Sequence, residues 1–247
     1  MPPSTPPSGV LGIDTATADT TVAVTLDGDL LGERTAAPGS DGRPRHASAL
    51  LAEIEAVVAQ AGGWPRIDAI AVGVGPGTFT GLRVGIATAR ALAQGRGLAL
   101  APVSSLAALA LGIGESRAAR GSTRLPLIDA RRGEVFAALH AVDGGVLWEP
   151  FVASPQEIEA RARDLDRAPV AAGDGSLRSR QQLEAAGVEV LPQADPAHRM
   201  AARHTCALAA DAEPGRLEQA TPLYLRRPDA EVWREQRHRD PEPVRPT

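Results

Sequence analysis

The spacing of apolar residues changes several times along the chain. Short stretches that alternate or are wholly apolar predict β-strands, and apolar positions three or four residues apart predict helices. Strands are expected at 10–14, 20–26, 30–36, 68–74, 98–103, 125–130, 134–140, 146–152, 169–172 and 188–191. Helices are expected at 46–61, 80–94, 104–111, 155–165, 176–186 and 196–210. This mixture of elements predicts an α/β protein.

The two halves of the chain repeat one order of elements. Each half begins with three strands in a meander and continues into helix and strand. A polar stretch of Gly, Arg and Ser at 112–124 marks the connection, so we expect one lobe over 9–111 and a second over 112–227. The helix at 196–210 is expected to pack back on the first lobe. Disorder is expected in the terminal tails, 1–8 and 228–247. Such a repeat is typical of actin-like and ribonuclease-H-like folds.

Composition excludes several classes of chemistry. All 26 basic residues are arginine, so neither a P-loop lysine nor a Schiff-base lysine is available. The formal net charge is −4, whereas a protein that binds nucleic acid through its own surface is usually basic. The single Cys206 cannot form an internal disulfide, and no apolar run is long enough for a membrane span. We therefore expect a soluble cytoplasmic protein without membrane contact.

The stretch 73–85 has the strongest local signal. A buried strand runs into a glycine turn, and a helix with a free amino end follows, which is an arrangement that binds phosphate. The candidate contacts are Gly75, Gly77, Thr78 and Thr80. The P-loop pattern is incomplete because no lysine follows the glycines. A tight strand-to-helix turn that requires glycine dihedral angles explains the same residues equally well.

Small residues recur every four positions along the helix that follows. Gly81, Gly85, Ala89 and Ala93 would form a smooth ridge that lets another helix approach closely. The neighbouring helix can belong to the same domain or to a partner chain, and the pattern does not decide between them.

Two acidic strand ends are candidates for ligand contacts. Asp14 ends the first strand, where a carboxylate could organise Mg²⁺ and phosphate, but no glycine hairpin accompanies it and hydrogen bonds within a turn explain it as well. Asp129 ends the matching strand of the second half beside Arg131 and Arg132. That turn could bind an anion or form surface ion pairs, and ion pairs are favoured.

Searches for metal ligands and nucleophiles find little. No two of the five histidines are four residues apart, and no Gly-x-Ser-x-Gly motif is present. Cys206 lies in an apolar helical pattern that favours an inert buried thiol. The residues alone therefore predict no catalytic set and no metal site.

Four motifs in order make the chain resemble the TsaB (YeaZ) family. These motifs are 11–17 (LGIDTAT), 75–85 (GPGTFTGLRVG), 128–136 (IDARRGEVF) and 222–226 (PLYLR). The resemblance covers residues 10–227. It implies an actin-like (ASKHA) fold of two lobes, with mixed sheets flanked by helices. It also implies the role of a non-catalytic dimerisation subunit in N6-threonylcarbamoylation of adenosine 37 in tRNAs that read ANN codons.

The resemblance further implies partners. The chain would form a heterodimer with the transferase TsaD, work with the ATPase TsaE, contact tRNA mainly through the complex, and form a homodimer when alone. No cofactor of its own is implied, although ATP or ADP could lie at the interface. Family complexes join through helices of the first lobe, which implies the interface residues Leu50, Ile54, Gly81, Gly85, Ala89 and Ala93.

The resemblance also separates this chain from its metal-bearing paralogue. Ser105 and Leu109 stand where that paralogue has two imidazole ligands, so the metal motif is incomplete. Two other functions remain as alternatives: an independent actin-fold kinase or ATPase, and a remnant of an M22-type metallopeptidase.

Overall fold

The computed structural model describes residues 7–210 and 217–226. The expected tail at 228–247 lies outside these residues, as do residues 1–6 of the expected tail at 1–8. In the described part of the chain, no helix combines the length and the apolar character that crossing a bilayer requires.

The first sheet has the strand order β3-β2-β1-β4-β5. Its strands are β1 (Gly9–Asp14), β2 (Thr20–Leu26), β3 (Asp29–Ala36), β4 (Ala69–Gly73) and β5 (Ala99–Val103). β1, β2 and β3 form an antiparallel meander, and β4 and β5 add parallel to β1. The wholly buried β1 and β4 lie at the centre, where both faces of the sheet are covered.

The second sheet repeats that topology with the order β10-β9-β6-β7-β8. Its strands are β6 (Arg124–Arg131), β7 (Glu134–His140), β8 (Val146–Ala153), β9 (Val170–Ala172) and β10 (Glu189–Val190). The meander β6-β7-β8 is antiparallel, and β9 and β10 continue the sheet in parallel. Two mixed sheets with equivalent strand orders, each flanked by helices, are the actin-like architecture that the family resemblance implies.

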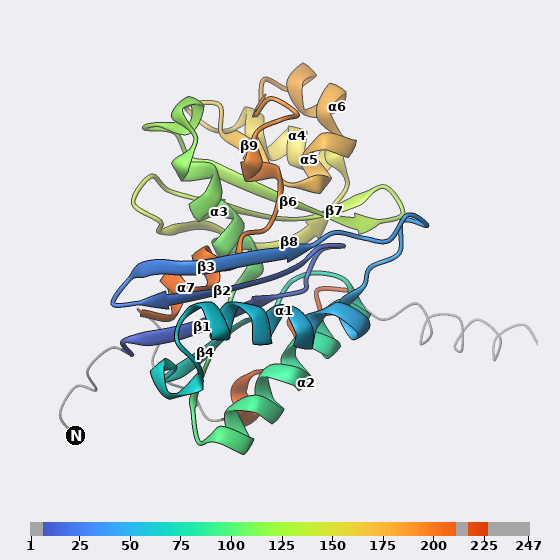
Figure 1. Ribbon diagram of the computed structural model, residues 1–247. Helices are drawn as coiled ribbons and strands as arrows, with labels where there is room; N and C mark the ends of the chain where they lie inside the picture. The colour runs from blue at the N-terminus through green and yellow to red at the C-terminus, as the bar shows by residue number, and fades with distance from the viewer. Residues whose placement is uncertain (1–6, 211–216, 227–247) are drawn as a thin grey trace, which may run out of the picture.

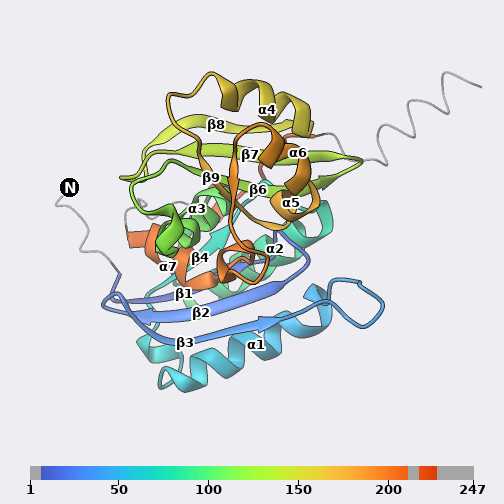
Figure 2. The ribbon, with the colours of Figure 1, turned by 90° about the horizontal axis from the view of Figure 1, so that it is seen from above.

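The elements stack in five layers, which Figures 1 and 2 show from two directions. α1 (His46–Gln60) and α2 (Phe79–Arg96) cover the outer face of the first sheet. α7 (Ala202–Ala210) packs on the inner face of that sheet and contacts α3 (Ser105–Glu115), which packs on the second sheet. α4 (Pro155–Arg163), α5 (Asp174–Arg178) and α6 (Arg180–Ala185) lie on the second lobe.

Successive side chains of β1 point to opposite faces of the first sheet, and each face packs against a different layer of helices. Leu11 and Ile13 point into the core beneath α1 and α2, whereas Val10 joins the small residues around α7. A Cβ on Gly12 would lie 2.6 Å from both the carbonyl oxygen of Ala202 and Cys206 Sγ, so only glycine lets α7 approach so closely. Because a helix returns from residue 202 to the first sheet, the two halves do not separate cleanly in sequence.

The helices predicted in the first half of the chain are confirmed, whereas those predicted at 176–186 and 196–210 need correction. Residues 176–186 form two short helices that break at Ser179, and residues 196–210 form the 3-10 turn η3 (Pro196–His198) followed by α7. Arg199 between them is extended, with φ −113° and ψ 144°. α3 continues to Glu115 through the expected connection, because Gly112 and Gly114 leave room for His204 and Arg124. The remaining turns are η1 (Trp64–Arg66), η2 (Arg117–Ala119) and η4 (Leu217–Gln219).

Candidate functional site

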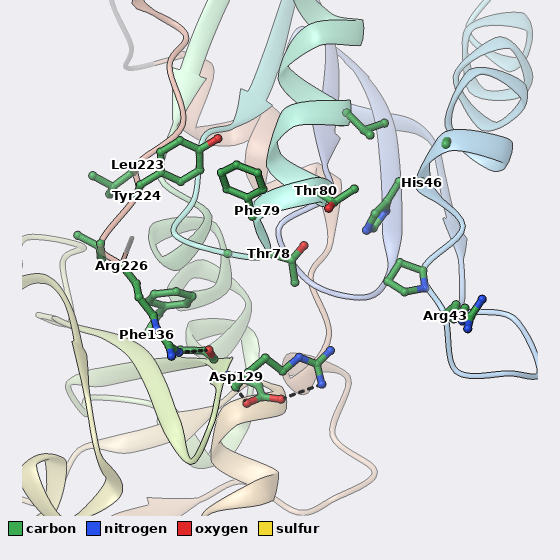
Figure 3. A pocket seen from close by; sticks show the side chains of 18 residues that line it. Arg43, His46, Thr78, Phe79, Thr80, Asp129, Phe136, Leu223, Tyr224 and Arg226 are labelled. Carbon is green, nitrogen blue, oxygen red and sulfur yellow. Dashed lines mark hydrogen bonds and ion pairs between the residues drawn. The ribbon is translucent and has the colours of Figure 1, made fainter. Parts of the chain in front are cut away.

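A cavity of about 640 Å³ lies between the two lobes at the amino end of α2. Four segments line it: the chain before and at the start of α1, the first turn of α2, the β6–β7 region, and the returning segment 223–226 (Figure 3). Both lobes therefore contribute to one cavity, and segments more than 100 residues apart meet there.

The glycine turn places the amino end of α2 at the cavity. Gly75 has a φ of +105°, which favours glycine. A Cβ on Gly77 would lie 2.5 Å from the carbonyl oxygen of Ala16, and the next residue, Thr78, donates its N–H to that oxygen at 2.8 Å. The tight-turn explanation of these glycines is thus correct, and the same turn brings the first turn of α2 to the cavity.

Two polar side-chain atoms at the cavity floor have no hydrogen-bond partner among the described residues. Thr78 is the N-cap of α2, but its Oγ1 makes no capping bond and is buried. His46 is only 4% exposed; its Nδ1 lies 2.8 Å from Thr20 Oγ1, while Nε2 lacks a partner. Burial lowers the pKa of His46, against the opposing effects of the Thr17 backbone and Asp19. In Figure 3, His46, Thr78 and Thr80 lie next to one another at the start of α2.

Aromatic and cationic side chains form the opposite wall. The rings of Phe79 and Tyr224 lie 5.1 Å apart, and the Arg83 guanidinium lies 3.7 Å from the Phe79 centroid. Arg83 Nε also donates to the Tyr224 hydroxyl at 3.0 Å. Further along, Arg226 donates to the carbonyl oxygen of Ala130 at 3.2 Å and pairs with Glu134 at 3.1 Å. The returning segment thereby ties the first lobe to the second.

The carboxylate of Asp129 is already paired with arginine side chains of this chain. Its carboxylate is 8% exposed and lies 3.0 Å from Arg178 and 3.3 Å from Arg131. It also accepts the N–H of Arg131 at 2.9 Å, where Arg131 and Arg132 have φ values of +67° and +54°. These contacts match the ion-pair interpretation of the turn.

Asp14 does not reach the cavity. The described residues that line the cavity include Gly77, Thr78 and Thr80 but neither Asp14 nor Gly75. Asp14 is 1% exposed and lies beneath Gly73, whose Cβ would be 1.9 Å from Asp14 Oδ2. The expectation that Asp14 and Gly75 contact a ligand here is therefore corrected, because both residues are buried by other parts of the chain.

The small residues of α2 face inward, which corrects the expected contact surface. Gly81, Gly85, Ala89 and Ala93 are all buried in the chain itself. A Cβ on Gly85 would lie 2.2 Å from Thr15 Oγ1, and one on Gly81 would lie 2.0 Å from the carbonyl oxygen of Thr15. The ridge thus lets α2 approach the end of β1, which is the internal alternative.

Leu50 and Ile54 are buried too, at 2% and 1% exposure, in the core beneath α1. The large apolar residue exposed on α1 is instead Leu51, at 60%. Ala47 on α1, which also lines the cavity, is exposed too, as are Ala87 and Ala91 on α2. These residues form the surface that another molecule could reach; we call it the α1–α2 face.

The positions that lack the paralogue's imidazoles are filled by core contacts. Ser105 is fully buried, and Leu109 is 2% exposed in the core between α3 and the second sheet. No cluster of three or more His, Cys, Asp or Glu side chains suited to a metal occurs within residues 7–210 and 217–226. Burial raises the pKa of Cys206 to about 12, so its thiol stays protonated at neutral pH.

A second cavity of about 720 Å³ lies beside α3 and α7. Arg203 bridges Glu33 at 2.7 Å and Glu115 at 2.8 Å across its wall, and His204 Nε2 lies 2.9 Å from Glu115. The charges of these acidic and basic side chains are therefore paired within this chain.

Sequence patterns do not point to His46, and they assign no contact to Tyr224 or Arg226. Nothing in the sequence around His46 marks it, since a lone histidine before a helix has no spacing partner. Tyr224 and Arg226 stand in the fourth motif, but only the folded chain brings that motif to the cavity.

Comparisons with known proteins identify the relatives of this chain. The family described as TsaD, tRNA N6-adenosine threonylcarbamoyltransferase, matches residues 41–159. No curated protein sequence matches. A solved structure described as an uncharacterized protein with similarity to peptidase YeaZ from Pseudomonas aeruginosa is 30% identical, with a TM-score of 0.72, and the match covers 89% of this chain and all of that one.

Two further solved structures are similar to this chain. YeaZ from Pseudomonas aeruginosa is 26% identical with a TM-score of 0.71, over 88% of this chain and 100% of that protein. The ethanolamine utilization protein EutJ from Carboxydothermus hydrogenoformans shares the fold, at 16% identity and a TM-score of 0.50, over 81% of this chain and 90% of that one. With the shared fold and nearly complete coverage at 30% identity, the chain belongs to the TsaB (YeaZ) family.

Proposed function

We propose that this protein is an accessory subunit that binds a TsaD-type threonylcarbamoyltransferase and activates it for N6-threonylcarbamoylation of adenosine 37 in tRNAs that read ANN codons. Membership of the YeaZ family carries the proposal, supported by the match of residues 41–159 to the TsaD family. This match indicates that the chain and TsaD share part of their fold, and proteins that share a fold can associate through equivalent surfaces.

The site geometry supports an accessory role over an independent actin-fold kinase or ATPase. Such an enzyme needs a carboxylate that faces the cleft and organises Mg²⁺, and Asp14 is instead 1% exposed and hydrogen-bonded within its own turn. Asp129, the matching residue of the second lobe, is held by Arg131 and Arg178. One relative is described as similar to a peptidase; for a metallopeptidase, three or more metal-binding side chains would have to meet, and the described residues hold no such cluster of His, Cys, Asp or Glu.

The α1–α2 face is the proposed docking surface for TsaD. It combines the 60% exposed Leu51 with small side chains, so a partner helix can lie close to both helices. A homodimer through the same face would form when TsaD is absent. TsaE and tRNA would join through the assembled complex, in keeping with the chain's net charge of −4.

Reconstitution of tRNA modification tests the proposal. Threonylcarbamoylation by TsaD and TsaE from the same organism, with the carrier enzyme that supplies threonylcarbamoyl-AMP, is measured with and without this protein. We expect little product when it is omitted and recovery when it is added back. Equal modification in both reactions would refute the proposed role. Turnover of Mg-ATP by the isolated chain would support the kinase or ATPase alternative. ATP or ADP at the interface with TsaD is part of the proposal and is tested by binding to the complex.

A further inference from the structure

The amino end of α2 carries unused hydrogen-bond donors at one point of the cavity. The N–H groups of Phe79, Thr80 and Gly81 precede the first intrahelical bond, which Leu82 donates to Thr78 at 3.0 Å. No hydrogen bond to another described residue uses them. Helix dipoles make such a position favourable for negative charge.

Two buried side chains point to the same place independently of the helix end. A Cβ on Gly81 would lie 2.5 Å from Thr78 Oγ1 and 3.1 Å from His46 Nε2, so both unpartnered atoms lie against the first turn of α2, beside the carbonyl oxygen of Thr15. His46 is 96% buried, given its 4% exposure. A buried polar atom without a partner is unfavourable, so a ligand that supplies the missing hydrogen bond is favoured at this position.

We propose that the amino end of α2, with Thr78 Oγ1 and His46 Nε2, is a binding site for the phosphoryl group of a small organic phosphate. Thr78 can donate its hydroxyl proton. The Thr20 hydroxyl can donate to His46 Nδ1, which places the ring proton on Nε2, so that this atom also donates. Three backbone N–H groups and two side-chain donors match the three terminal oxygens of a phosphate ester better than the two oxygens of a carboxylate.

The rest of the cavity indicates an organic ester rather than free phosphate. Phe136, Leu223, Val84 and the Phe79–Tyr224 pair offer apolar surface beside the donors. Arg43, Arg131 and Arg226 also line the cavity, and each is paired with a carboxylate of this chain. The inference concerns the isolated chain and does not depend on the TsaD association, so each can fail separately.

The probes are inorganic phosphate and phenyl phosphate, added to the full-length ¹⁵N-labelled chain at constant ionic strength. We expect phosphate to shift the amide resonances of Phe79, Thr80 and Gly81 and the Nε2 resonance of His46. Phenyl phosphate should shift the same signals at severalfold lower concentration. Acetate and chloride arms separate phosphate recognition from general anion effects.

Thr78→Val is the decisive variant because it is isosteric and the hydroxyl makes no bond within the described chain. It should weaken phosphate binding about tenfold, as for loss of one hydrogen bond to a charged group, while the unfolding midpoint of the free chain does not fall. Thr205→Val is the matched control: Thr205 Oγ1 is likewise buried without a partner, but it lies on α7 away from the cavity. His46→Asn, which keeps a polar atom facing Thr20, should also weaken binding.

The proposal is overturned if the first-turn amides stay unmoved up to saturating phosphate. It is equally overturned if acetate shifts them as strongly as phosphate, or if both valine variants weaken binding alike. Selective loss with Thr78→Val and retention with Thr205→Val would establish the site.

Discussion

Ser105 Oγ donates a 2.8 Å hydrogen bond to Asp14 Oδ2 across 91 residues of sequence. The bond joins the end of β1 to the start of α3, and Asp14 Oδ1 accepts the N–H of Ala16 at 2.8 Å. A carboxylate that the sequence offers as a candidate for Mg²⁺ and phosphate thus secures the junction between the central strand and the helix that leads to the second lobe. Burial raises the pKa of Asp14 to about 6, and the two hydrogen bonds oppose that rise.

Asp14→Asn should make stability less dependent on pH. The folded-state pKa of about 6 exceeds the unfolded value of 3.8, so the folded chain binds the proton more tightly. The resulting stabilisation is complete below pH 3.8 and is lost as the pH rises through about 6. At pH 7 the buried charge therefore costs on the order of 3 kcal/mol, which asparagine removes.

Urea unfolding of both proteins between pH 4 and pH 7.5 measures this. The wild type should lose stability relative to Asp14→Asn as the pH rises from 4 to 6.5. Parallel curves over that range would show that Asp14 titrates normally.

Two alanine substitutions on α2 should have opposite signs. Gly85→Ala places a methyl group 2.2 Å from Thr15 Oγ1, so we expect destabilisation by about 1–3 kcal/mol through overpacking. Gly95→Ala has nothing within 4 Å and should stabilise the helix by about 0.5–1 kcal/mol. The free energy of unfolding in urea gives both values. Stabilisation by Gly85→Ala would mean that the small-residue ridge is not packed inside the chain.

Leu51→Arg should block association with TsaD without unfolding the chain. Leu51 is 60% exposed, so arginine is accommodated in the monomer but places a charge in the proposed contact. Leu147→Arg on β8 is the control, because Leu147 is similarly exposed at 53% in the other lobe. Calorimetric titration with TsaD measures affinity, and we expect at least a tenfold loss for Leu51→Arg only, which is about 1.4 kcal/mol. Equal affinities of the two variants would exclude the α1–α2 face as the docking surface.

Arg203→Gln should destabilise the chain by about 1 kcal/mol. Arg203 on α7 connects Glu33 of β3 with Glu115 of α3 and is about one-third exposed, so solvent screens part of its effect. Arg163→Gln, which breaks only the surface pair with Glu159 within α4, is the control and should change stability little. Urea unfolding at low and high salt measures both, and the Arg203 effect should shrink with salt. A salt-independent difference would point to lost packing rather than charge.

Much of the fold follows from the sequence because local patterns suffice for it. The helix at 46–61 has a regular apolar face and a Gly-Gly stop, and it appears as His46–Gln60. The strand at 134–140 is found with the same bounds. The helix at 196–210 was wrong at its start, since Arg199 is extended where the chain crosses between the two lobes. Periodicity cannot report such a crossing, because its position depends on contacts with distant residues.

The same distinction between local patterns and contacts of distant residues applies to the candidate site. The sequence by itself determined the glycine turn and the free helix start at Thr78, because both depend on neighbouring residues and on the dihedral freedom of glycine. Only the tertiary structure decided which way the ridge at Gly81 and Gly85 faces, that Asp14 is closed off, and that His46 joins the site. Each of these depends on atoms far apart in sequence, such as Thr15 against Gly85 and Ser105 against Asp14, and close packing alone sets which of them meet.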